Sequence, residues 1–249
     1  MNNKSEPLPG LRVRNLSRRY GNHVAVRGLD LDLRQGEVLG LLGPNGAGKS
    51  TTMQMLAGTL APGGGSIEIC GIDLMEHPAA AKVHLGYLPE IPPLYPELTV
   101  REFLRYAARL HQVPRGKLDG AIDRTLQQCA LIEVGHRLIG RLSKGYRQRV
   151  GIAQALVHNP SVIILDEPTA GLDPLQRREM RTLIGELGRN RGVLLSTHSL
   201  TEAEALCGKV LILQQGGAVF CGQMEDLRNA HEGSMEDVFV QLTRQGDPA

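Results

Sequence analysis

The sequence predicts an α/β protein built on a parallel β-sheet, preceded by a smaller antiparallel sheet and interrupted by a helical segment. Three observations lead to this fold class. Apolar and polar residues alternate in residues 11–16 and 24–33, uninterrupted apolar runs follow from Glu37, and residues 97–159 show only helical patterns. Alternation is typical of a half-buried antiparallel sheet, whereas continuous apolar strands are typical of a parallel sheet covered on both faces.

The expected elements follow the chain in that order. Continuous apolar strands are expected at 38–42, 162–165 and 193–195, and a further strand pair at 210–213 and 218–220 brackets the Gly216-Gly217 turn. Thr99 and Glu102 form a capping box that begins one helix, and a second is expected at 118–130. Residues 89–96 contain four prolines, so they form a stiff extended connector between sheet and helices.

Length and composition indicate one compact unit. The 249 residues are 41% hydrophobic and 22% charged, with a formal net charge of +2. This near balance argues against a surface built for nucleic acid. The four cysteines form no C-x-x-C pair, which favours reduced thiols. No apolar run approaches the ~20 residues of a membrane span, and the first ten residues lack a signal-peptide core, so we expect a cytosolic protein.

The sequence GPNGAGKST at residues 43–51 predicts a nucleoside triphosphate site. It follows an apolar strand, and its glycines let successive backbone N–H groups turn inward around phosphate. A helix expected to begin at Lys49 directs its positive dipole end to the same phosphates. Lys49 is expected to reach the β- and γ-phosphates, and the Ser50 hydroxyl to bind Mg²⁺. The expected phosphate-binding residues are Gly43, Asn45, Gly46, Ala47, Gly48, Lys49, Ser50 and Thr51.

A second motif, SVIILDEP at residues 161–168, supplies the acids. A buried strand that ends in Asp166 brings this carboxylate beside the phosphate loop, where it can hold Mg²⁺ through water. Glu167 comes next, placed to polarise a water against the γ-phosphate as a general base.

Four further motifs lie along the chain: RRYGN around Tyr20, LSKGY at 142–146, GLDP at 171–174 and STHSL at 196–200. Together with the two above, they make the chain resemble the ATP-binding subunit of an ABC transporter over nearly all of residues 10–225. The resemblance implies a P-loop NTPase of the ABC-cassette type, with an N-terminal antiparallel β subdomain and an inserted α-helical subdomain. We expect a β and α/β core at 10–96 and 160–225, a helical subdomain at 97–159 and a C-terminal tail at 226–249.

The resemblance also implies roles for single residues. Tyr20 would stack on adenine. Ser143 and the Gly145 amide lie at the expected start of a helix, where they would hold a γ-phosphate. Asp173 would lie in the loop that crosses a dimer interface, and His198 would contact the γ-phosphate. Lys144 and Tyr146 depart from the common L-S-G-G-Q form of the signature.

Glu90 is the departure that matters most. The family normally has glutamine there, contacting Mg²⁺ and the attacking water. Glu90 is therefore expected to act in catalysis and, with Ser50 and Asp166, to bind Mg²⁺; the alternative is that it points at a partner or at solvent. GYLPEIPPLYPEL and LSKGYRQR also resemble a branch of exporter-type ATPases that includes those of gliding motility, polysaccharide or drug export and nitrous oxide reductase maturation.

The resemblance implies an ATPase subunit that forms a head-to-tail homodimer around two Mg·ATP and drives a separate integral membrane permease, as an exporter. Such a subunit would sit on the cytoplasmic face of the inner (plasma) membrane. Two alternatives come from other classes. A non-transport ABC ATPase would act on ribosomes or DNA, but typically carries two cassettes, long coiled coils or zinc inserts. A GTP-binding switch would need an N-K-x-D motif, which the chain lacks.

Overall fold

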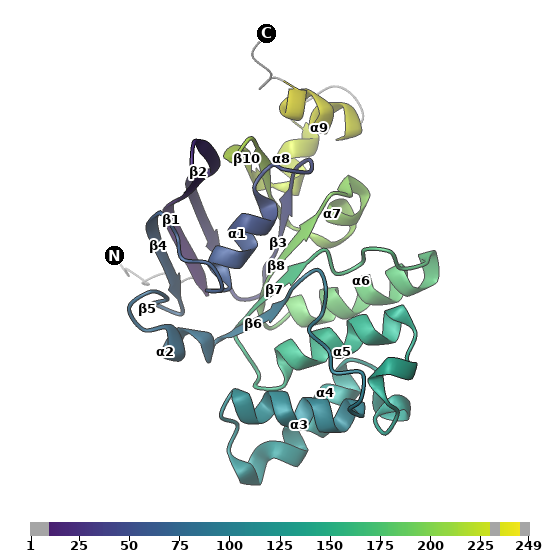
Figure 1. The fold of residues 1–249 in the computed structure, drawn as a ribbon. Helices are drawn as coiled ribbons and strands as arrows, with labels where there is room; N and C mark the ends of the chain where they lie inside the picture. The colour runs from purple at the N-terminus through teal and green to yellow at the C-terminus, as the bar shows by residue number, and fades with distance from the viewer. Residues whose placement is uncertain (1–9, 230–234, 245–249) are drawn as a thin grey trace, which may run out of the picture.

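The computed structural model describes residues 10–229 and 235–244, and two β-sheets form the centre of this part (Figure 1). Helix α1 (Lys49–Leu56) lies between the sheets, and a group of helices covers the far face of the larger one. This arrangement confirms the predicted fold class. Residues 1–9, and residues 230–234 and 245–249 of the predicted tail, lie outside the described residues.

The larger sheet has the strand order β10-β9-β3-β8-β7-β6. All neighbouring pairs are parallel except β9 and β10, which form the predicted hairpin. Its strands are β3 (Val38–Leu42), β6 (Leu85–Leu88), β7 (Val162–Asp166), β8 (Gly192–Thr197), β9 (Lys209–Gln214) and β10 (Gly217–Gln223). Every residue of β7 and β8 is buried, as expected for strands covered on both faces.

The smaller sheet is antiparallel and has the order β2-β1-β4-β5. Its strands are β1 (Leu11–Tyr20), β2 (His23–Leu33), β4 (Gly64–Ile69) and β5 (Ile72–Asp73). Leu29, Leu31 and Leu33 of β2 are buried, which confirms the alternation predicted there. Strands β4 and β5 were not predicted.

One part of the core surrounds α1. Met53, Met55 and Leu56 of this helix are fully buried against side chains of both sheets, including Leu39 and Leu41 of β3. Burial of each such side chain contributes about 1.5–3 kcal/mol, so packing fixes a helix whose own eight residues would be too few to form it alone.

The predicted helical segment contains α3 (Val100–Leu110), α4 (Leu118–Gln128) and α5 (Lys144–Leu156), with the short helices η1 (Arg115–Lys117), η2 (Ile132–Val134) and η3 (Ile139–Arg141). Thr99 caps α3 in the predicted capping box, with the Glu102 carboxylate accepting from the Thr99 N–H at 2.8 Å. The connector at residues 89–96 contains no helix, as predicted, but bends at residues 90 and 91 and a turn that begins at Pro96 interrupt its extended course.

The remaining helices are α2 (Pro78–Lys82), α6 (Pro174–Gly188), α7 (Leu200–Leu206), α8 (Met224–Asn229) and α9 (Met235–Arg244). Helices α6 and α7 follow β7 and β8, so their first turns lie beside the carboxyl ends of those strands (Figure 1). None of the described helices combines the length and the apolar character that crossing a bilayer requires.

Strand β6 was also missed by the sequence analysis. It has only four residues, and Gly86 interrupts its apolar pattern. The glycine is required by packing, because a Cβ at this position would collide with the carbonyl oxygen of Ala155 in α5. This close approach brings α5 onto the sheet and directs the chain after β6 into the connector that begins at Pro89.

Two stacked histidines join the helical segment to the sheet. The rings of His111, which follows α3, and His158, which follows α5, lie parallel with centroids 3.7 Å apart. His158 Nε2 lies 3.0 Å from the Leu85 carbonyl oxygen, so the neutral ring donates there. Burial, together with the nearby His111, lowers the pKa of His158 to about 4, and burial also lowers that of His111.

This pair should make the fold sensitive to acid. The pKa of histidine in an unfolded chain is ~6.5. Between that pH and pH 4, the unfolded chain therefore binds a proton at His158 that the folded protein does not bind. The free energy of unfolding consequently falls as the pH falls through this range. We expect His158→Gln, which keeps a donor but does not titrate, to flatten the loss of urea stability between pH 7.5 and 5. His136→Gln, at an exposed position, is the control; equal acid slopes in both variants and the wild type would contradict this role.

Candidate active site

The phosphate loop joins β3 to α1 in the conformation that its glycines permit. Gly43, Gly46 and Gly48 have φ angles of +151°, +80° and +104°. Gly48 precedes the first turn of α1 and makes no side-chain cap, so the N–H groups of that turn stay available for an anion. A Cβ at Gly48 would also collide with the Ala25 carbonyl oxygen, which leaves glycine as the residue that fits.

Lys49 lies folded back over this loop. Its ammonium group donates to the carbonyl oxygens of Gly43 at 2.6 Å and Pro44 at 3.1 Å, and the residue is only 7% exposed. Burial lowers the pKa of Lys49, while the negative charges of Glu167 and Asp166 act in the opposite direction. A compact cation at the floor of the loop is suited to bind phosphate oxygens as a point charge.

Ser196 in β8 connects the two predicted acids. Its hydroxyl donates to Asp166 Oδ1 at 2.5 Å and accepts from the backbone N–H of Glu167 at 2.9 Å. The contact follows from strand register, because Asp166 and Ser196 are paired across the parallel strands β7 and β8. Burial raises the pKa of Asp166; the Ser196 hydrogen bond opposes this effect, and the charge of Glu90 adds to it.

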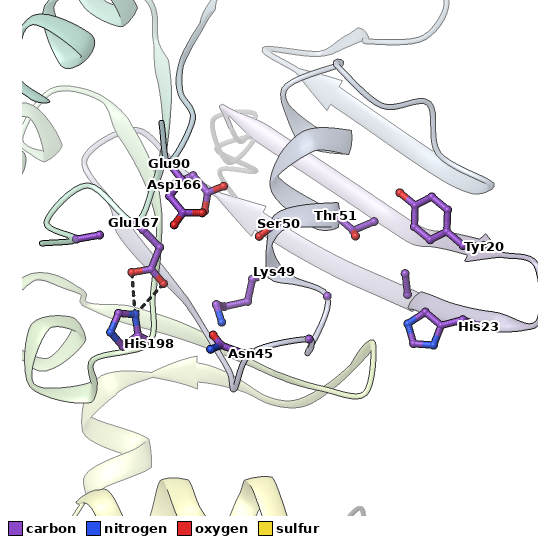
Figure 2. A pocket seen from close by; sticks show the side chains of 14 residues that line it. Tyr20, His23, Asn45, Lys49, Ser50, Thr51, Glu90, Asp166, Glu167 and His198 are labelled. Carbon is purple, nitrogen blue, oxygen red and sulfur yellow. Dashed lines mark hydrogen bonds and ion pairs between the residues drawn. The ribbon is translucent and has the colours of Figure 1, made fainter. Parts of the chain in front are cut away.

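Glu167 and His198 meet at the carboxyl ends of the same two strands. His198 Nδ1 donates to the Glu167 carboxylate, lying 3.0 Å and 3.1 Å from its two oxygens (Figure 2). Burial raises the pKa of Glu167, and the hydrogen bond from His198 opposes that rise. Glu167 also has a φ angle of +47°, an uncommon conformation for a residue with a side chain. A carboxylate held in this way can accept a proton from a water in the cavity.

A cavity of about 710 Å³ unites most of the predicted residues. Figure 2 shows Glu167 and His198 at one end, Lys49 and Ser50 in the middle, and Tyr20 and His23 at the other end. Tyr20 is 46% exposed, which leaves part of its ring accessible for stacking, and the Arg18 guanidinium carbon lies over the ring, 5.1 Å from its centre. The lining residues are Tyr20, His23, Ala25, Asn45, Gly46, Gly48, Lys49, Ser50, Thr51, Glu90, Asp166, Glu167, Ala170 and His198.

The signature residues lie outside this cavity. Ser143 caps α5, its hydroxyl accepting from the Tyr146 N–H, and both Ser143 and Gly145 line a separate cavity of about 560 Å³. Asp173 caps α6 by accepting from the Gln176 N–H at 2.9 Å. Two other predicted residues act through backbone atoms. The Gly43 carbonyl oxygen accepts from the Lys49 ammonium group, and the Ala47 carbonyl oxygen accepts from the Gly216 N–H. One chain therefore carries the phosphate loop and the signature as two separate surfaces.

Oxygen atoms suited to Mg²⁺ converge beside the phosphate loop. The Ser50 hydroxyl and the carboxylates of Asp166 and Glu90 line the same cavity. Mg²⁺ in nucleotide sites keeps several waters and uses one or two carboxylates together with substrate phosphates, so these donors fit it. Within the described ranges, no cluster of three or more His, Cys, Asp or Glu side chains could hold a metal ion by itself.

Comparison with known proteins decides the family. A profile described as ABC transporter matches residues 26–170, a span that includes the phosphate loop and both acids. The chain belongs to the ABC transporter family. It is an ATP-binding subunit of this family and an ATPase, because the ABC ATP-binding domains it matches are ATPases that drive transport.

Several relatives of this ABC subunit cover most of its length. It is 37% identical over 236 residues to an uncharacterized ABC transporter ATP-binding protein of Bacillus subtilis, YxlF, with 95% of this chain and 78% of that protein covered. It is 38% identical to the bacitracin transport ATP-binding protein BcrA of Bacillus licheniformis, over 83% of this chain and 67% of that one. It also matches a probable multidrug ABC transporter ATP-binding protein of Escherichia coli, YbhF, at 33% identity, but covers only 43% of it.

Solved structures give the same answer for the fold. One described as the ATP binding subunit of an ABC transporter superposes with a TM-score of 0.83 at 33% identity, covering 93% of this chain and 98% of that one. Another, CbiO1 from Clostridium perfringens, described as part of the ABC transporter complex CbiONQ, has a TM-score of 0.77 at 26% identity, covering 94% and 98%.

Some residues of the site were not found by sequence reasoning. His23, Ala25 and Ala170 line the cavity without belonging to a motif that was quoted for nucleotide binding. Ser196 was missed because its role depends on strand register. Its position in STHSL, two residues before His198, would have placed it opposite Asp166 once the two strands were taken as neighbours.

Glu90 gives a prediction for the acidic end of the cavity. It is near enough to Asp166 for its charge to raise the pKa of that residue, so a cation between them should be bound more tightly than with the usual glutamine. We expect Glu90→Gln to keep ATP turnover within about tenfold, because an amide oxygen still orients metal and water, and to shift the Mg²⁺ requirement upward.

The measurement is a Mg²⁺ titration of ATPase activity at saturating ATP. Glu97→Gln is the control, because Glu97 lies in the same loop but outside the cavity. An unchanged Mg²⁺ titration for Glu90→Gln would favour the alternative, in which Glu90 faces the permease or solvent. Turnover as low as that of Glu167→Gln would instead show that the general base has been assigned to the wrong carboxylate.

Proposed function

We propose that two copies of this chain close head to tail around two Mg·ATP and thereby power a separate integral membrane permease. The observation that carries the proposal is the separation of the phosphate loop from Ser143 and Gly145, which line another cavity of the same chain. The start of a helix suits a γ-phosphate, and a second copy brings the start of α5 to one. Each ATP then lies between the phosphate loop of one copy and the signature of the other.

Within each such site, different residues bind the phosphates, stack on the base and activate the attacking water. Lys49 binds the β- and γ-phosphates, and Tyr20 stacks on adenine. Glu167 accepts a proton from the attacking water, while His198 passes from the Glu167 carboxylate to the γ-phosphate as the site closes. Mg²⁺, when bound by Ser50, Asp166 and Glu90, neutralises charge on the phosphate oxygens. Asp173, at the start of α6, faces the partner copy.

The permease docks on an apolar surface formed by the connector and α3. Leu110 is 64% exposed and lines a small cavity of about 170 Å³ together with Tyr95 and Tyr106, whose rings pack edge-to-face at 5.6 Å. Exposed apolar side chains gathered in this way are typical of protein interfaces. Because Glu90 of the connector lines the nucleotide cavity, closure around ATP moves the docking surface as well.

The transport direction we propose is export, from the cytoplasmic face of the inner (plasma) membrane. A relative named for Nod factor export supports this direction, and two others are named for bacitracin transport and as a multidrug ABC transporter. We assign the chain to the exporter branch that includes the gliding-motility and nitrous oxide reductase maturation ATPases. This assignment rests on the amino-acid sequence around Glu90 and in the signature. The competing function is a non-transport ABC ATPase that acts on a soluble macromolecular partner.

A docking variant tests the choice between these functions. We expect a polytopic membrane protein to co-purify with the wild type from detergent-solubilised membranes of the native cell, and Leu110→Glu to abolish this, since a charge cannot be buried unpaired in an apolar contact. Val83→Glu is the control, because Val83 is also exposed but lies beside α2. A soluble macromolecular partner, retained equally by both variants, would favour the competing function.

Removing the proposed base gives a kinetic prediction. Glu167→Gln should keep ATP binding but lower turnover by about 10²–10⁴-fold, as expected when a general base is lost. Because bound ATP is no longer cleared, the variant should also accumulate as an ATP-bound dimer in size-exclusion chromatography with Mg·ATP. Turnover close to that of the wild type would contradict the assignment of Glu167.

A further inference from the structure

A buried carboxylate lies behind the catalytic residues, in the first turn of α7. Glu202 is only 2% exposed, and its two oxygens are both used. Thr169 Oγ1 donates to Oε1 at 2.6 Å, and Thr197 Oγ1 donates to Oε2 at 2.6 Å. Both distances are short, so each oxygen of the Glu202 carboxyl group has a strong hydrogen-bond donor. Burying a charged group is costly unless it is bonded in this way, so packing alone does not explain a glutamate here.

The two threonines belong to the two loops that carry the proposed catalytic groups. Thr169 follows Glu167 by two residues, in a turn closed by the Ala170 N–H donating to the Glu167 carbonyl oxygen at 3.1 Å. Thr197 is the last residue of β8 and directly precedes His198. Both threonines are nearly fully buried, at 6% and 0% exposure. One carboxylate therefore ties the loop of Glu167 to the loop of His198 on the side away from the cavity.

Hydrogen bonds also hold the start of α7, which carries Glu202, against the end of β8. Its own backbone N–H donates to the Ser199 hydroxyl at 3.3 Å, and the Ser199 N–H donates to Thr197 Oγ1 at 3.0 Å. The start of α7 is thus bonded to the end of β8 through side chains. A shift of either loop would leave a buried oxygen or hydroxyl without its partner, which is unfavourable.

We propose that Glu202 is a positioning residue for ATP hydrolysis, which holds the Glu167 and His198 loops at a fixed separation. On the cavity side these loops meet through the hydrogen bond between Glu167 and His198; on the buried side they meet through Glu202. Glu167 needs such support because its positive φ angle is kept only where surrounding structure imposes it. The proposal rests on the proposed role of Glu167 as the base.

Two substitutions of Glu202 separate positioning from simple packing. Glu202→Leu removes both acceptors, and we expect kcat to fall about 10–100-fold with the Kd for Mg·ATP within about threefold, since small displacements of a catalytic group cost rate and not affinity. Glu202→Gln keeps one acceptor oxygen, and its amide can donate to the second hydroxyl, so kcat should recover to within about fivefold of the wild type. The matched control is Glu204→Leu in the same helix, where Glu204 instead pairs with Arg228 at 3.6 Å.

Thr169→Val and Thr197→Val provide a test that does not depend on the folding of the leucine variant. Each removes one hydroxyl and keeps the side-chain shape. Each should lower kcat, and their effects should be strongly non-additive with each other, because both changes break the same network.

Three results would overturn the proposal. One is a Glu202→Leu variant that binds ATP and keeps kcat within about twofold of the wild type. Another is additive effects of the threonine variants. The third is a parallel loss of ATP affinity and thermal stability at unchanged kcat per folded molecule, which is the mark of a purely structural residue. Normal ATP turnover by Glu167→Gln would show that the base is assigned wrongly. Low turnover by Glu167→Gln together with any of the three results above would instead show that only the Glu202 proposal is wrong.

Discussion

The site depends on one constraint, the parallel alignment of β3, β8 and β7 with their carboxyl ends at the same edge of the sheet. Residues from three distant parts of the chain follow these strands: the phosphate loop after Leu42, the two acids at the end of β7, and His198 after β8. The register of the parallel strands places these residues side by side at one edge of the sheet. The Ser196 hydroxyl adds a bond from the middle strand to both acids.

The charges at this edge are arranged for a ligand that is itself strongly charged. Asp166 and Glu167 are both buried enough for their pKa values to rise, and Glu90 adds a third carboxylate to the cavity. Lys49 is the cation at the floor of the loop, and its burial lowers its pKa. Carboxylates and phosphates repel one another, whereas a divalent cation between them reverses the sign of the interaction. In the proposed function, this charge pattern would favour Mg·ATP over free ATP.

Sequence patterns predicted the features of the fold and the site that depend on local chemistry. The glycines of the phosphate loop, the acids that end an apolar strand and the cap at Thr99 each act within a few residues, so their spacing is informative. What the patterns could not supply depends on register or packing. Strand β6 is short and contains Gly86 for the sake of α5, and Ser196 and Glu202 act across strands and loops. From sequence alone, a glutamate in a helix is expected at the surface, and only the structure shows that Glu202 is buried between two threonines.

The most direct test of the shared ATP site uses two inactive variants together. Lys49→Ala damages the phosphate loop, and Ser143→Arg blocks the signature surface, so a heterodimer has one site with both lesions and one site with neither. Tagged copies would be mixed, heterodimers purified by sequential capture, and the ATPase rate compared with that of each variant alone. The shared-site account predicts that the heterodimer regains activity. A confirmed heterodimer no more active than either parent would contradict it.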